Sequence, residues 1–189
     1  MRALRKLLRS HPRLRAFVAS VVRAWPGQAS GSMRVVPFDE VPIVRKRLDA
    51  AWLDASIPLR QRELVELELA RLASGEFIAH FHGLAEMVAR LVAEQNVTSP
   101  SLLEIGCSSG YYVDVFRALG VNVNYVGCDI SPSFIALARQ KHPRIDFLVA
   151  DAVQLPFDTR QFDVVLSGCC LLHIPEYSKA IVETARVAK

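Results

Sequence analysis

The spacing of hydrophobic and polar positions changes at about residue 100 of this 189-residue chain. Before that point, apolar residues recur at intervals of three and four, which predicts amphipathic helices over Pro58–Ala73 and Glu76–Asn96. After it, short apolar runs alternate with helical patterns. This alternation is typical of a parallel sheet whose successive strands are connected by helices.

The second half of the chain therefore predicts an α/β fold with a doubly wound parallel sheet. Gly120 and Pro143 are expected to end two of its helices. The predicted strands are Leu102–Ile105, Asn124–Cys128, Ile145–Val149 and Phe162–Ser167. The predicted helices are Tyr111–Leu119, Ser131–His142 and Glu176–Ala188.

The residues from Ser101 to Tyr112, SLLEIGCSSGYY, combine a buried strand, a tight glycine turn and a helix start. Gly106 and Gly110 bracket three small residues. Glycine permits positive φ and lets a ligand approach the backbone closely. The free N–H groups and the positive dipole end of the next helix face the same point. This pattern predicts a nucleotide-type binding turn.

Polar or small residues lie at the ends of all four predicted strands. In order, they are Glu104 with the glycine turn, Asp129, Asp151, and the pair Ser167 and Gly168. Ligands of such sheets bind beyond the carboxyl ends of the strands, and an acid about 20 residues after the glycines commonly binds a ribose. Asp129, 19 residues after Gly110, has that position, and Asp151 could accept from an adenine amino group. Each acid could instead cap a helix or lie in a solvated loop, but their shared edge favours ligand binding.

The turn differs from the fingerprint of dinucleotide-binding proteins. Its spacing is Gly106-x-x-x-Gly110, and Ser108 stands where GxGxxG has its second glycine. A carboxylate at Glu104 would repel a phosphate, whereas it suits a ligand that carries an ammonium group. A nicotinamide-dependent oxidoreductase is therefore the less favoured alternative.

Three segments resemble, in order, the successive motifs of the class I S-adenosylmethionine-dependent methyltransferases. The segments are LLEIGCSSGYYVDVF, YVGCDIS and FLVADAVQLPFDTRQFDVVLSGCCLLHIP. The most similar branch is the small-molecule group that includes the ubiquinone-biosynthesis-type enzymes. The resemblance covers about Leu102 to Lys189 and implies a Rossmann-like fold, here without the family's C-terminal strands. It also implies S-adenosylmethionine as cofactor and methyl transfer to a small organic acceptor, at an O, N or C atom.

The resemblance implies a role for most of the residues at the strand ends. Glu104 and the glycine turn would surround the methionine part of the cofactor, Asp129 would hold the ribose, and Asp151 would meet the adenine edge. Tyr112 could face the sulfonium through its ring or serve only in packing. The full set of expected cofactor-binding residues is Glu104, Gly106, Cys107, Ser108, Gly110, Tyr112, Asp129, Ile130, Asp151, Ala152, Ser167 and Gly168.

The chemistry of methyl transfer mainly requires that donor and acceptor be aligned and water excluded. His173, in LLHIP, is the candidate catalytic base for an acceptor that must lose a proton, although it could instead shape the loop or cap the next helix. The sequence SGCC after the fourth strand differs from the Asn/Asp-Pro-Pro-aromatic signature of enzymes that methylate nucleic-acid amino groups. We therefore expect a small organic acceptor, or a lipid, and neither nucleic acid nor a metal site.

The net charge of +4 originates at the N-terminus, because eight of the 23 Lys and Arg residues lie before residue 39, where there is no acid. The rest of the chain has a net charge of −4 and lacks the basic character of a nucleic-acid-binding domain. Apolar residues among the arginines before Trp25 are compatible with a helix pair on a membrane surface, a poor secretion signal or a frayed tail. The cysteines show no CxxC spacing, which favours a reduced, cytoplasmic protein, with peripheral membrane contact through the basic segment as an option.

Three segments are expected along the chain. They are a basic extension and linker over residues 1–42, N-terminal helices on the substrate side over 43–99, and an incomplete cofactor-binding domain over 100–189. Without a fifth strand, the fourth would expose an apolar edge, which natural sheets avoid. The chain is therefore expected to be a fragment, a half that a dimer or a partner chain completes at this edge, or a truncated pseudoenzyme. A cofactor-binding module without turnover is the alternative to an active enzyme.

Overall fold

The structure is a computed structural model that describes residues 41–95 and 97–189. These residues belong to one compact unit, which extends from Val36 to Lys189. The predicted basic extension and almost all of the linker lie outside the described residues, so the three-segment division stays a prediction. None of the described helices is long and apolar enough to cross a membrane.

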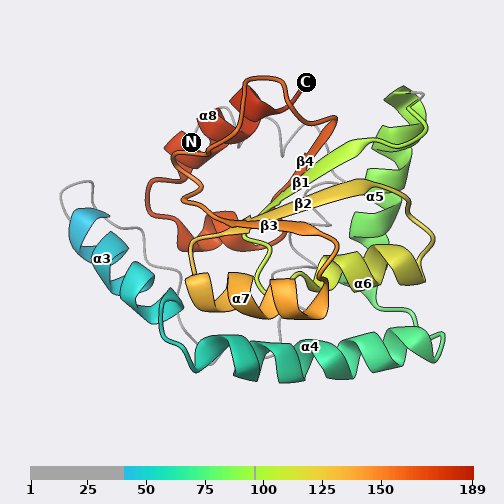
Figure 1. The fold of residues 1–189 in the computed structure, drawn as a ribbon, viewed down its shortest axis with the longest axis horizontal. Coiled ribbons are helices and arrows are strands. Elements are labelled where there is room, and N and C mark those ends of the chain that lie inside the picture. Colours follow the sequence, from blue (N-terminus) through green and yellow to red (C-terminus); the bar gives the residue numbers. More distant parts are fainter. Residues whose placement is uncertain (1–40, 96) are drawn as a thin grey trace. The chain divides into compact units, whose positions relative to one another are not determined.

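A four-stranded parallel sheet with the strand order β3-β2-β1-β4 forms the centre of the fold (Figure 1). Its strands are β1 (Ser101–Ile105), β2 (Asn124–Asp129), β3 (Asp146–Val149) and β4 (Val164–Leu166). The strand order reverses between β1 and β4, because the chain crosses from β3 to the far side of β1. This reversal creates a topological switch point at the carboxyl ends of β1 and β4, where ligands of such sheets bind.

Helices cover both faces of the sheet, as the doubly wound prediction requires (Figure 1). On one face, α5, α6 and α7 pack with Leu102 and Tyr125 in one buried cluster, which Leu72 of α4 joins, and α4 packs against α6 and α7. On the other face, α8 packs with Leu103 and Cys128 in a second cluster. The helices are α3 (Val41–Trp52), α4 (Ile57–Ala73), α5 (Ala79–Gln95), α6 (Tyr111–Ala118), α7 (Pro132–Lys141) and α8 (Tyr177–Val187), with one 3-10 turn, η2 (Cys170–His173).

The observed elements agree with the predicted ones except at three places. α5 begins at Ala79, three residues after the predicted Glu76. Pro42 ends the predicted linker, yet it lies in the first turn of α3, a position where proline is tolerated. The fourth strand is shorter than Phe162–Ser167, because Phe162 forms an isolated parallel bridge with Ala188 ahead of β4. β4 lies at an edge of the described sheet, as the sequence indicated.

Candidate functional site

The glycine turn after β1 has a backbone that only small residues can adopt. Gly106 and Gly110 have φ angles of +74° and +72°. A Cβ atom on Gly106 would lie 2.3 Å from the Cβ of Cys170, and one on Gly110 would lie 2.7 Å from the ring of Phe147. Both glycines are therefore required by conformation and by space. Ser108 also has a positive φ, +54°, a conformation that favours glycine.

Asp129 links this turn to the start of α7. Its Oδ2 accepts from the backbone N–H of Ser108 at 2.9 Å, and its Oδ1 accepts from the N–H of Ser131 at 2.9 Å. Burial raises the pKa of Asp129, while hydrogen bonds from backbone N–H groups oppose the shift. The carboxylate thus fixes the loop geometry at the end of β2. This local role was the alternative to ribose binding, and the two are compatible because each carboxylate oxygen can accept more than one hydrogen bond.

Glu104 is a buried carboxyl group in an aromatic environment. Only 1% of the residue is exposed, and the hydroxyl group of Tyr125 donates a hydrogen bond to it. Burial raises the pKa of Glu104 to about 8, and the nearby charge of Asp129 adds to the rise. No described residue forms an ion pair with Glu104. The side chain is therefore neutral at pH 7 unless a cation is bound beside it.

The end of β4 faces the same region from the other side of the switch point. The hydroxyl group of Ser167 is buried and has no hydrogen-bond partner among the described residues. A Cβ on Gly168 would lie 3.6 Å from the ring of Tyr112, so this ring covers the backbone there. Burial raises the pKa of Cys169, and the charge of Glu104 adds to the shift. The structure thus brings the predicted residues of β1, α6 and β4 together.

Two N-terminal helices contribute side chains that the sequence analysis did not identify. Arg45 of α3 donates to Asp151 and to Glu176, and the Ser108 hydroxyl group donates to Gln61 of α4. Arg45 and Trp52 are seven residues apart and lie on one side of α3, since residues two turns apart share a helix face. These contacts of Arg45 and Gln61 join positions far apart in the sequence. No local sequence pattern could therefore have predicted them.

His173 lies on η2, the 3-10 turn that follows β4. The ring of Trp52 meets its imidazole edge-on, with centroids 4.9 Å apart and planes at 67°. The imidazole is partly exposed, and its partial burial lowers its pKa. His173 is therefore mostly neutral at pH 7 and able to accept a proton. Its catalytic role stays a prediction.

Two histidines of α5 have local partners. The Nε2 of His80 lies 3.3 Å from Glu68 of α4, and the Nδ1 of His82 lies 3.0 Å from the carbonyl oxygen of Ile78. His82 thus serves the first turn of its own helix. Within the described residues, no group of three or more His, Cys, Asp or Glu side chains is arranged to hold a metal ion.

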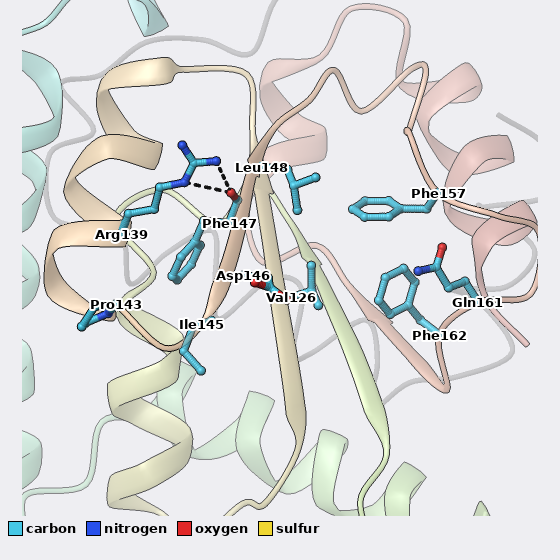
Figure 2. A pocket seen from close by; sticks show the side chains of 10 residues that line it. All are labelled: Val126, Arg139, Pro143, Ile145, Asp146, Phe147, Leu148, Phe157, Gln161 and Phe162. Atoms are coloured by element: carbon cyan, nitrogen blue, oxygen red, sulfur yellow. Dashed lines mark hydrogen bonds between the residues drawn. The ribbon is translucent and has the colours of Figure 1, made fainter.

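A pocket of about 660 Å³ lies beside β2 and β3 and is separate from these residues (Figure 2). Val126, Phe157 and Phe162 line its apolar side. Arg139 of α7 lines another side, and its guanidinium donates to the carbonyl oxygen of Phe147 at 2.6 and 3.1 Å. None of the residues predicted to bind the cofactor lines this pocket.

A parallel sheet with a switch point, a glycine turn after its first strand and an acid after its second define a nucleotide-binding α/β domain. A family model described as "Methyltransferase domain" matches residues 103–189. Together with the fold and the motifs, this match supports a class I S-adenosylmethionine-dependent methyltransferase domain in this part of the chain, as the sequence indicated.

Curated relatives match the same region. The chain is 29% identical over 102 residues to the phthiotriol/phenolphthiotriol dimycocerosates methyltransferase of Mycobacterium leprae, a match that covers 51% of this chain and 38% of the relative. It is 33% identical over 91 residues to the demethylmenaquinone methyltransferase of Chlorobaculum tepidum, covering 48% of this chain and 37% of the relative. The chain thus spans well under half the length of these two relatives.

A solved structure has a similar fold. It is described as a proposed S-adenosyl-L-methionine-dependent methyltransferase from Methanococcus maripaludis, with a TM-score of 0.57 and 14% sequence identity. The match covers 72% of this chain and 60% of that one. At this identity the likeness concerns the fold alone.

Proposed function

We propose that this domain binds S-adenosylmethionine at the carboxyl ends of β1, β2 and β4 and transfers its methyl group to a small organic acceptor. The observation that carries the proposal is Glu104. It is a buried carboxyl group without a cationic partner among the described residues, and it lies on the strand that leads into the glycine turn. A ligand with an ammonium group would supply the missing cation. The unpartnered hydroxyl group of Ser167 fits a polar ligand in the same region.

The proposed cofactor contacts follow the order of the strands. Glu104 and the turn from Gly106 to Gly110 hold the methionine part, and Asp129 accepts from the ribose hydroxyl groups. Ile130 packs on the adenine ring, whose edge meets Asp151 and Ala152. The remaining contacts near the sulfonium are made by Tyr112, Ser167 and Gly168.

When bound, the cofactor supplies an activated methyl group on a positively charged sulfur. The residues of this chain bind and orient it, and they exclude water from the reacting atoms. We assign the catalytic base to His173, since its lowered pKa leaves the imidazole neutral and able to take a proton from the acceptor. An acceptor that is nucleophilic without deprotonation would not need this step.

The proposed acceptor is a small organic molecule or a lipid. Two relatives are named for methylation of demethylmenaquinone and of phthiotriol or phenolphthiotriol dimycocerosates, which favours an acceptor of this kind here. We place the protein in the cytoplasm. A second chain at the edge of β4 is a further part of this proposal.

The test is a calorimetric titration of the chain with S-adenosylmethionine, S-adenosylhomocysteine and NAD. Asp129→Asn should weaken binding of the first two about tenfold to a hundredfold, since it removes a charged acceptor of ligand hydrogen bonds. The matched control is Asp146→Asn, an exposed acid at the other end of a strand, which should leave the affinity unchanged. Because Asp129 also holds the loop, the unfolding of each variant is measured in parallel.

The outcomes separate the alternatives. Binding that is weakened only by Asp129→Asn supports the cofactor site and justifies a search for the acceptor. Cofactor binding without product for any acceptor favours a binding module. Tighter binding of NAD than of S-adenosylmethionine, or no binding by a folded chain, contradicts the proposal.

A further inference from the structure

Arg45 lies among three acids, which are Asp49 of its own helix, Asp151 after β3 and Glu176 before α8. Its Nε lies 2.9 Å from a carboxylate oxygen of Asp49 on the same helix. Its Nη1 lies 3.1 Å from Glu176, and its Nη2 contacts Oδ2 of Asp151. The arginine side chain is only 17% exposed, and all three of its nitrogen atoms are engaged. Arg45 therefore fastens α3 to the loop after β3 and to the start of α8.

The contact with Asp151 concerns the carboxylate that is proposed to meet the adenine edge. Oδ1 of Asp151 already accepts from the N–H of Val153 at 3.1 Å, which fixes the carboxylate within its own loop. Oδ2, the other carboxylate oxygen, accepts from Nη2 of Arg45. A ligand amino group that approaches Oδ2 would meet the guanidinium in the same place.

We propose that Arg45 and the 6-amino group of the cofactor's adenine compete for Oδ2 of Asp151. This inference rests on the proposed function and adds a positioning residue to it: Arg45 closes the adenine side of the site in the absence of ligand. Since both donors approach the same oxygen from outside the loop, the guanidinium must withdraw from Oδ2 to admit the adenine amino group, while Asp49 and Glu176 continue to hold Arg45. The affinity of the chain for its cofactor is thereby lowered.

The size of the effect follows from the exposure of the pair. Asp151 is 37% exposed, so its ion pair with Arg45 belongs with partly screened surface pairs. Arg45→Ala should therefore tighten the binding of S-adenosylhomocysteine by about two- to fivefold. Arg47→Ala is the matched control, since Arg47 lies on the same helix, is exposed and has no ion pair among the described residues.

Two further measurements distinguish competition from a general loosening of α3. The first is a double-mutant cycle, in which Arg45→Ala should have no effect on affinity in an Asp151→Asn background. The second uses S-inosylhomocysteine, which carries a carbonyl oxygen in place of the 6-amino group. Because that ligand has no donor at the 6 position, and its 6-oxygen can accept from the guanidinium, Arg45→Ala should not tighten its binding.

Each outcome bears on the proposal. Weaker binding by Arg45→Ala, or an equal gain for both ligands, overturns the competition, even if Asp129→Asn shows that the cofactor site is real. A folded chain that binds neither ligand, with or without Arg45, overturns the proposed function and the competition together.

Discussion

The pKa of Glu104 makes the stability of the ligand-free protein depend on pH in a definite direction. The folded state raises this pKa from its ordinary value of 4.5 to about 8, so folding favours the protonated form. The resulting stabilisation is fully present below about pH 4.5 and is lost as the pH rises through about 8. The complete span corresponds to about 5 kcal/mol, and the part lost between pH 6.5 and 8.5 is about 2 kcal/mol.

Glu104→Gln tests this reasoning, because glutamine keeps the shape and an acceptor for the Tyr125 hydroxyl group but does not titrate. Urea unfolding followed by circular dichroism would be measured for both chains at pH 6.5 and 8.5. The original chain should lose about 2 kcal/mol more than the variant over this interval. Other titrating groups, such as the buried cysteines, are the same in both chains and cancel in the difference.

The same group gives a signature of ligand binding. An ammonium group beside Glu104 would stabilise its charged form, so binding at pH 7 should release close to one proton. Calorimetry in buffers of different ionisation enthalpy measures this number. An equal pH dependence of unfolding in the two chains would refute the raised pKa. Cofactor binding without proton release would show that no ligand cation lies beside Glu104.

Three further predictions concern the glycine turn and the catalytic base. Gly106→Ala should destabilise the fold by at least about 2 kcal/mol in urea unfolding, because the added Cβ would collide with Cys170. The control Gly120→Ala should cost only about 1 kcal/mol, since Gly120 has a similar φ of +71° but no atom within 4 Å of an added Cβ. Equal losses would mean that the Cys170 contact is unimportant. Ser108→Gly in a Gln61→Ala background should stabilise the protein by about 1 kcal/mol, since it relieves the positive φ and no hydrogen bond to Gln61 is left to lose; a loss of stability would contradict the strain. His173→Gln should lower kcat for methyl transfer about a hundredfold and abolish the acidic limb of the pH profile, which reflects a pKa below 6.5; an unchanged profile would exclude His173 as the base.

The strands and the glycine turn were predictable because their signals are local. Buried parallel strands require continuous apolar runs, and Gly106 and Gly110 mark the turn by residue type alone. The position of Asp129 followed from its spacing after the turn, and its hydrogen bond to the N–H of Ser108 places it against the turn. The set of cofactor contacts itself stays a prediction.

The contributions of α3 were not predictable in the same way. Arg45 reaches Asp151 across 106 sequence positions and Glu176 across 131, so no spacing rule links them. Trp52 meets His173 through the packing of α3 and η2, which depends on the whole fold. The length of β4 was overestimated for a similar reason, because the partner of Phe162 is Ala188 at the far end of the chain.

Two acids of the proposed site are neutralised by different means in the absence of ligand. Glu104 is neutralised by a proton, because burial disfavours its charge, whereas Asp151 is neutralised by the guanidinium of Arg45. In the proposed site, the cofactor displaces both the proton and the guanidinium, and each displacement should cost affinity. The consequences of substitution nevertheless have opposite signs. Glu104→Gln removes the group that the ligand needs and should weaken binding, whereas Arg45→Ala removes only the competitor and should tighten it. The opposite effects of the two substitutions on affinity follow from the proposed positions of Glu104 and Arg45 beside the ligand. They would not be expected if both side chains simply supported the fold.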